Sequence, residues 1–315
     1  MLKRLLLMFA LLSCLRGAAF AADPADSAPD YLRYAEDPVS ARLEVAIRSF
    51  SLPSGQTVDL VGAVHIADAP YYQELNRRFT AYDAVLFELV GDPRHLTRAP
   101  PPGEQNLQGS GSTISFIQQA ASRYLNLTFQ LGAIDYSGKN MVHADMSYEE
   151  FERLQAARGE NMATMFIRAM QAQANGSMND VAMEELNTFA LIRILMSPDA
   201  ATEFKKALAK VFDQTESLTI AMEGQSGTTI LSGRNEVAVK RMKEVLANKK
   251  QRRIAVFYGG AHMPGIEKAL IQDLGAKAAG EEWLPAWTMP KVKTTPATTR
   301  PADTTPAPGT AKPAS

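Results

Sequence analysis

Two Gly-x-x-His segments contain two of the four histidines of this chain. The first runs from Gly62 to His65 and the second from Gly259 to His262, and each lies between an apolar strand-like run and a helix-like run. Between them, Glu88 stands in an otherwise apolar run, where an unpaired carboxylate would be costly to bury. Two imidazoles and one carboxylate form a ligand set for a divalent metal ion such as zinc, manganese, cobalt or iron. The sequence therefore predicts a metal site made of His65, Glu88 and His262.

A metal held by three protein ligands keeps a position open for water and substrate, and it would support hydrolysis of an amide or ester. Two simpler interpretations stand beside this one. Either histidine could be a structural residue that follows a strand, and Glu88 could pair with Arg234 in a buried ion pair without a catalytic role. Neither alternative is excluded by the spacing of the residues.

Three further residues are second-rank candidates. His143 and Asp145 end another strand-like run and could add an imidazole or a carboxylate to the same edge, although Asp145 could instead stabilise the start of the following helix. Asn235 directly follows Arg234. The remaining histidine, His95, follows Asp-Pro-Arg in a loop and is expected to be solvated.

Several function classes are excluded by the composition. The only cysteine is Cys14, so a mature chain cleaved after Ala21 contains no cysteine, and disulfides, zinc thiolates and cysteine nucleophiles are excluded. The formal net charge is −1 and no basic block occurs inside the domain, so nucleic acid is not an expected partner. The sequence also lacks the His-Glu-x-x-His motif of zinc proteases, the Gly-x-Ser-x-Gly motif of serine hydrolases and the Gly-x-x-x-x-Gly-Lys-Ser/Thr motif of phosphate-binding loops.

The elements that would position these residues begin with a β-hairpin. Residues Leu43–Phe50 and Thr57–Ala63 have strand patterns and flank a Pro-Ser-Gly turn signal. An amphipathic helix is expected at Tyr71–Thr80 and a strand at Ala84–Val90. Strand, helix and strand form a βαβ unit with parallel strands. His65 and Glu88 are therefore expected at the C-terminal ends of neighbouring strands, the edge where open α/β sheets bind ligands.

The middle of the chain is predicted to be a loop followed by helices. A Pro- and Gly-rich loop covers Pro93–Ser112, and helical periodicity resumes at Thr113–Leu125. A short strand at Met141–Ala144 is followed by a helix that opens with a capping box at Ser147–Glu150. The region Phe151–Phe212 is helical in pattern and rich in methionine, which serves as core filler or as an adaptable surface for peptides.

In the C-terminal third, the pattern predicts a helix at Asn235–Leu246 and a buried strand at Ile254–Tyr258. A second helix is expected to begin at Met263-Pro264, and a closing strand is expected at Glu282–Met289. Together these elements predict an α/β fold. Its central sheet is mixed and largely parallel and is flanked by helices, with an N-terminal β-hairpin and a Met-rich helical insert.

The ends of the chain are expected to lie outside this domain. Residues 1–21 have the charged start, apolar stretch and small-x-small ending of an export signal, although Cys14 also fits a lipoprotein box and a lipid anchor. Residues 22–40 are interpreted as a leader, 41–289 as one domain and 290–315 as a disordered Pro-, Thr- and Ala-rich tail. The export signal predicts that the protein lies in the periplasm, the cell envelope or the extracellular space. No later apolar run is long enough to span a bilayer, so no transmembrane span is expected.

At these motifs the chain resembles the TraB/PrgY/GumN family, which is related to the TIKI metalloproteases and more distantly to erythromycin-esterase-like and ChaN-like proteins. The resemblance rests on four segments: Val61–His65, Phe87-Glu88, Arg234-Asn235 and Tyr258–Gly265. It covers most of Leu43–Leu274. The resemblance implies the same mixed sheet with helices on both faces.

The resemblance also implies that His65, Glu88 and His262 are metal-binding or catalytic residues and that Arg234 lies next to them. TIKI proteins look like metal-dependent peptidases, so the leading expectation is an exported metal-dependent hydrolase that acts on a peptide or protein substrate, with Arg234 stabilising a developing oxyanion. PrgY-type members are described as blocking or degrading a peptide pheromone, so a non-catalytic protein that binds or sequesters a peptide is the second hypothesis. Haem or iron binding, as in ChaN-like proteins, is the third, and it would depend on Tyr or His ligands because no Cys-x-x-Cys-His segment exists.

Overall fold

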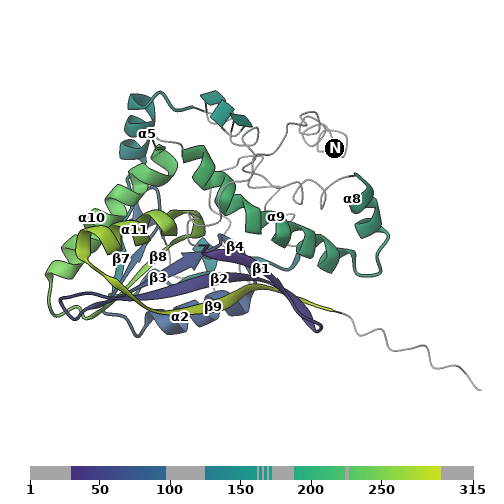
Figure 1. The fold of residues 1–315 in the computed structure, drawn as a ribbon, viewed down its shortest axis with the longest axis horizontal. Helices are drawn as coiled ribbons and strands as arrows, with labels where there is room; N and C mark the ends of the chain where they lie inside the picture. Colours follow the sequence, from purple (N-terminus) through teal and green to yellow (C-terminus); the bar gives the residue numbers. More distant parts are fainter. Residues whose placement is uncertain are drawn as a thin grey trace, which may run out of the picture.

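The structure of the protein is a computed structural model, which describes residues 30–96, 125–161, 163–164, 167–168, 170–171, 188–223 and 227–291. A seven-stranded mixed sheet forms its centre, and helices cover both faces (Figure 1). This confirms the predicted fold class. The sheet consists of β1 (Leu32–Glu36), β2 (Ser40–Ser51), β3 (Thr57–Ala63), β5 (Ala84–Phe87), β7 (Met141–His143), β8 (Arg253–Gly259) and β9 (Lys277–Pro290).

The other described elements surround this sheet. The two-residue strands β4 (Ile66–Ala67) and β6 (Thr128–Phe129) form a small separate sheet. The helices are α2 (Ala69–Phe79), α4 (Gln130–Ala133), α5 (Tyr148–Ala157), α8 (Thr188–Leu195), α9 (Ala200–Glu223), α10 (Arg234–Ala247) and α11 (Met263–Leu274), with shorter helical turns at Pro93–His95, Thr229–Gly233 and Gly260–His262.

Strand β8 lies at the centre of the sheet, and its sequence explains why. Five consecutive residues, Ile254 to Tyr258, are fully buried, as is typical of a parallel strand covered on both faces. Phe257 faces the core cluster that includes α2, whereas Val256 and Tyr258 face the cluster that includes α10 and α11. Helix α2 therefore covers one face of the sheet, and α10 and α11 cover the other (Figure 1).

The strand order corrects one prediction. Strands β3 and β5 are parallel, as expected of a βαβ unit, but they are not neighbours, because β8 lies between them and pairs in parallel with both. The prediction assumed that consecutive strands pair, which is frequent but not required. The position of β8 between β3 and β5 determines which residues meet at the edge of the sheet. The ends of β3, β8 and β5, which precede His65, His262 and Glu88, lie side by side at one edge of the sheet.

The N-terminal boundary of the domain is also corrected. Strand β1 lies inside the segment that was interpreted as a leader, and it pairs with β2 in antiparallel register from Leu32 opposite Val45 to Glu36 opposite Ala41. Tyr31, just before it, is fully buried. The domain therefore includes about ten residues before the predicted boundary at residue 41.

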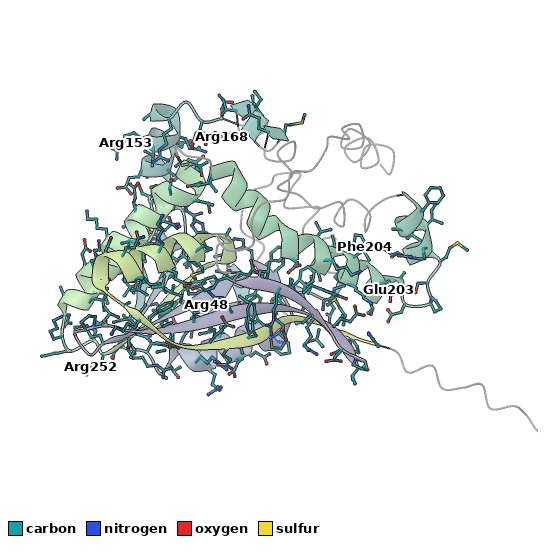
Figure 2. The ribbon with its side chains drawn as sticks, viewed as in Figure 1. Arg48, Arg153, Arg168, Glu203, Phe204 and Arg252 are labelled. Carbon is teal, nitrogen blue, oxygen red and sulfur yellow. The ribbon has the colours of Figure 1, made fainter. Side chains whose placement is uncertain are left out.

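Polar contacts as well as the apolar core join strand β2 to its neighbours. Arg48 of β2 (Figure 2) contacts Glu267 of α11 at 3.4 Å and Glu281 of β9 at 2.9 Å. Strand β9 pairs with β2 over its whole length, so the predicted hairpin of β2 and β3 and the predicted closing strand belong to the same sheet. The α9 helix, which carries Glu203 and Phe204 at its start (Figure 2), packs against β1, β2 and β9.

Several predictions lie outside the described residues. They concern most of the loop Pro93–Ser112, the helix Thr113–Leu125 up to its last residue, the export signal with Cys14, and residues 292–315 of the tail. Within the described ranges, no helix combines the length and the apolar character needed to cross a membrane. The predicted capping box is confirmed, since Ser147 and Glu150 bond reciprocally at the start of α5.

Candidate functional site

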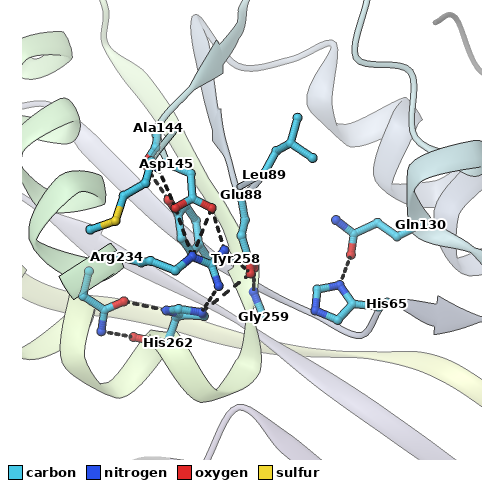
Figure 3. A network of polar contacts seen from close by, with 12 residues as sticks. His65, Glu88, Leu89, Gln130, Ala144, Asp145, Arg234, Tyr258, Gly259 and His262 are labelled. Atoms are coloured by element: carbon cyan, nitrogen blue, oxygen red, sulfur yellow. Dashed lines mark hydrogen bonds and ion pairs between the residues drawn. The ribbon is translucent and has the colours of Figure 1, made fainter. Parts of the chain in front are cut away.

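Three of the predicted residues converge on Gly259, at the end of β8 (Figure 3). A Cβ atom added to Gly259 would lie 3.3 Å from Oε2 of Glu88, 3.7 Å from Cδ2 of His262 and 3.9 Å from Nε2 of His65. The backbone of Gly259 has φ −51° and ψ 142°, which any residue can adopt, so its lack of a side chain matters here for space. The structure thus brings together three residues that are far apart in the sequence.

Glu88 is a buried carboxylate with strong partners. The backbone N–H of Gly259 donates to its Oε2 at 2.6 Å, and Nη2 of Arg234 donates to its Oε1 at 2.6 Å. Burial alone would raise the pKa of Glu88, but the neighbouring His262 and Arg234 lower it to about 2. Glu88 is therefore ionised at neutral pH, as a metal ligand or an electrostatic catalyst needs to be.

Arg234 joins two carboxylates and one imidazole. Its Nη2 also donates to Oδ2 of Asp145 at 2.5 Å, its Nε donates to Oδ1 of Asp145 at 3.0 Å, and its Nη1 lies 3.3 Å from Nε2 of His262. The ion pair of Arg234 with Glu88, which the sequence left as an alternative to a metal site, is thus present in the structure. Two carboxylates share one guanidinium, so negative charge exceeds positive charge in this buried cluster. One more positive charge would balance it.

A helical irregularity sets the position of Arg234. The π-helical turn Thr229–Gly233 leads directly into α10, and such turns are frequent at functional sites. Two carboxylates hold its backbone N–H groups, since Glu160 accepts from Thr229 at 2.9 Å and Glu223 accepts from Ser232 at 2.7 Å. Glu160 and Glu223 could not be selected from the sequence, because neither stands in a motif.

The contacts of His262 fix its tautomer. Nδ2 of Asn235 donates to the carbonyl oxygen of His262 at 3.2 Å, so the amide oxygen of Asn235 is the atom that faces Nδ1 of His262 at 2.7 Å. An amide oxygen only accepts, and the guanidinium of Arg234 only donates, so Nδ1 carries the proton and Nε2 carries the lone pair. Metal-binding histidines are commonly held in this way by a second residue. The second-rank candidate Asn235 therefore orients His262.

His262 is 4% exposed, and burial lowers its pKa to about 4, with Arg234 contributing in the same direction against Glu88. Below its usual pKa of 6.5 the unfolded chain takes up a proton that the native chain does not bind. We therefore expect the free energy of unfolding to fall between pH 6.5 and pH 4, by about 3 kcal/mol from this residue alone. Above pH 6.5 both states are neutral at this residue and its contribution no longer changes.

Urea denaturation of the parent and of His262→Gln at several pH values between 7 and 4 checks this expectation. The glutamine variant lacks the titrating group but shares all the others, so the stability difference between the two proteins should shift in favour of the variant as the pH falls. A difference that stays constant with pH would contradict the buried neutral state of His262.

His65 lies between β3 and β4 and is the exposed member of the site. Its Nδ1 lies 3.2 Å from Oε1 of Gln130, and its carbonyl oxygen accepts from the backbone N–H of Gln130 at 2.9 Å. Gln130 begins α4 and was not predicted, because no local pattern marks a glutamine 65 positions away as a partner of His65. The site is thus open to solvent on the side of His65 and closed on the side of His262.

The two Gly-x-x-His segments differ in structure, although the sequence predicted the same local device. Gly62 lies inside β3, and a Cβ at this position would come within 2.7 Å of Cγ1 of Val45, so close packing excludes a side chain there. Gly259 instead ends its strand and leads into the helical turn Gly260–His262. Both segments nevertheless end at the same edge of the sheet.

The remaining candidates lie beside the site rather than in it. Nε2 of His143 bonds to the carbonyl oxygen of Leu89 at 2.7 Å, and its ring packs 5.7 Å from that of Phe87. His143 therefore fixes the chain on either side of Glu88. Asp145 binds Arg234 and also accepts from the backbone N–H of Met146 at 2.8 Å, so it holds the guanidinium in place. The side chain of His95 lies outside the described residues.

The metal prediction can be compared with this arrangement. The donor types fit a divalent ion, with two imidazoles and one ionised carboxylate. Among the described residues, however, no three His, Cys, Asp or Glu side chains are grouped closely enough to hold a metal. Bonds from a metal to its ligands are about 2 Å long, and Arg234 lies at both Glu88 and Nε2 of His262. To bind an ion, the three donors would have to move closer together, and Arg234 would have to lose its contact with Glu88 or with His262.

A cavity elsewhere does not identify the site. A cavity of about 630 Å³ lies beside the start of α2 and is lined by Asp68, Tyr71, Lys205 and Thr288, among others. Two of its charged groups bond to each other, since Nζ of Lys205 donates to Asp68 at 2.5 Å. We therefore define the candidate site by the ionisable side chains around Gly259 and not by a cavity.

Comparisons with known proteins add no relative. No protein-family model, curated protein or solved structure matches the chain. The functional conclusion therefore depends on the residues around Gly259 and on the motifs that contain them.

Proposed function

We propose that this protein is a metal-dependent hydrolase that cleaves peptide bonds. The observation that carries the proposal is the convergence of Glu88, His65 and His262 on Gly259, with an open side at His65. The resemblance of the same motifs to the TraB/PrgY/GumN family supports it, and membership of that family is part of the proposal. The sequence pattern of residues 1–21 supports export to the periplasm, the cell envelope or the extracellular space.

In this proposal each residue has a distinct role. Nε2 of His65, Nε2 of His262 and the carboxylate of Glu88 would hold a zinc, manganese, cobalt or iron ion, which would lower the pKa of a water molecule and act as a Lewis acid toward the substrate. Asn235 keeps the proton of His262 on Nδ1, so that Nε2 stays unprotonated. Asp145 holds Arg234 next to the reacting groups, where its guanidinium can stabilise a developing negative charge.

A second candidate function is favoured by one observation. The contacts of Arg234 with Glu88, Asp145 and His262 already satisfy the buried groups without an ion. A protein with such a complete network could bind and sequester a peptide at this edge without cleaving it. Haem or iron binding remains the third hypothesis, and an absorbance spectrum of the purified protein decides whether haem is bound.

A substitution at Gly259 tests the proposal. We expect Gly259→Ala to place a methyl group between the three converging residues and to lower the rate of peptide cleavage by about 10²-fold, because small displacements of reacting groups have effects of this size. The assay is cleavage of a peptide library by the mature chain with manganese, cobalt, zinc or iron added, repeated with a chelator.

Gly280→Ala is the matched control, because a Cβ at Gly280 meets no atom within 4 Å and the residue lies in β9, away from the site. Equal rates for the two variants would place the reaction elsewhere. Peptide binding that Gly259→Ala weakens, with no cleavage by the parent under any ion, would replace the hydrolase by the sequestering protein.

A further inference from the structure

Gln130 makes three contacts that connect the exposed histidine of the site to the core. The residue is only 3% exposed, its backbone N–H donates to the carbonyl oxygen of His65, and its side-chain Oε1 lies 3.2 Å from Nδ1 of the same histidine. Its Nε2 donates to the hydroxyl of Tyr136 at 3.1 Å, and that tyrosine is itself buried against Phe87. The amide is therefore fixed at both ends, whereas the imidazole that it contacts is exposed.

The arrangement matches that of the second histidine. At His262 the amide oxygen of Asn235 faces Nδ1, and Nε2 points toward the converging groups. At His65 the amide oxygen of Gln130 faces Nδ1, and Nε2 is the atom directed to Gly259. Two amide side chains from different parts of the fold thus hold two histidines in the same orientation toward one point.

We propose that Gln130 is a positioning residue that keeps the proton of His65 on Nδ1 and so presents the lone pair of Nε2 to the site. This inference rests on the proposed function, because a lone pair on Nε2 is what a metal ligand or a general base requires at this position. Without Gln130, the imidazole of an exposed histidine exchanges its proton between both nitrogens and rotates freely. The amide selects one tautomer and one ring orientation.

The proposal depends on the orientation of the amide, which gives it a clear alternative. If the amide were reversed, the hydroxyl of Tyr136 would donate to Oε1, and Nε2 of Gln130 would donate to Nδ1 of His65. The histidine would then carry its proton on Nε2 and could not act as a ligand through that atom. The two arrangements leave different nitrogen atoms of His65 protonated.

The test is ¹⁵N nuclear magnetic resonance of the histidine side chains in the full mature chain, free of metal and above the pH at which imidazole protonates. The signals of His65 are assigned by their loss in His65→Ala. We expect the Nδ1-protonated tautomer in the parent and in Gln130→Glu, which keeps an acceptor oxygen. Gln130→Met, which has a similar size and no hydrogen-bonding group, should show a mixture of both tautomers.

Metal affinity gives a second and independent readout. Titration with zinc and with manganese should show an affinity that is about 10- to 100-fold lower for Gln130→Met than for the parent, as for other residues that orient a ligand. Gln130→Glu should recover most of this loss. Tyr136→Phe leaves the amide of Gln130 in place but removes the hydroxyl that fixes it, and it should also give a mixture of tautomers.

The outcomes separate this inference from the proposed function. An Nε2-protonated His65 in the parent, or an unchanged tautomer in folded Gln130→Met, overturns the role of Gln130. An Nδ1-protonated His65 that responds to Gln130→Met, in a parent that binds neither zinc nor manganese, supports the role of Gln130 and removes these two ions from the proposed function.

Discussion

Arg234→Met is expected to lower the free energy of unfolding by about 3–5 kcal/mol, which is the usual effect of removing one partner from a buried ion pair. The guanidinium contacts Glu88 and Asp145, whose side chains are 8% and 0% exposed. Methionine fills much of the same volume but offers neither charge nor donors. Two buried carboxylates would then have no cation beside them, and one of them would have to take up a proton.

Equilibrium denaturation in urea measures this effect. The matched control is Arg241→Met on the same helix, where the arginine forms an exposed pair with Glu244 and its loss should change stability by about 0.5 kcal/mol. A second substitution, Glu88→Gln, should restore part of the stability of Arg234→Met, because it removes one of the unpaired charges. Equal stabilities of Arg234→Met and Arg241→Met would contradict the electrostatic coupling described for the site.

His65→Ala is expected to separate activity from stability. His65 is exposed and its side chain bonds only to Gln130 among the described residues, so its loss should change the free energy of unfolding by only about 1 kcal/mol. The same substitution removes a nitrogen ligand or base from the point of convergence and should lower the rate of peptide cleavage by about 10²- to 10⁴-fold. Cleavage kinetics and urea denaturation on the same preparation check both parts.

His262→Ala is the informative comparison, since this histidine is buried and bonds to Asn235. That variant should lose both activity and stability. If His65→Ala cleaves peptides at the parental rate, His65 is not part of the reaction, and the site reduces to the buried groups on the side of His262.

The sequence predicted the local elements well where their pattern is strong. The apolar run of β8, the amphipathic helix α2 and the capping box of α5 depend on residues within a few positions of each other, and the structure confirms all three. The order of the strands was not predictable in the same way. Strand β8 pairs with β3 and β5 although it follows them by well over a hundred residues, and no local pattern records such a pairing.

The candidate site shows the same division. His65, Glu88, Arg234 and His262 could be selected from the sequence because glycine, histidine and charged residues stand out at the ends of apolar runs. The residues that orient them, such as Gln130 and Glu160, belong to ordinary polar stretches. Their function comes from contacts across 65 and 69 positions, which depend on the fold rather than on any spacing.

The most direct measurement is the metal content and metal affinity of the mature chain, purified without chelator and without a histidine tag, beside His65→Ala and His262→Ala. The proposed function predicts one bound manganese, cobalt, zinc or iron ion per chain in the parent and its loss in both variants, with His65→Ala still folded and nearly as stable as the parent. A folded parent that binds none of the four ions would contradict a metal-dependent hydrolase and would leave a peptide-binding protein built on the Arg234 network.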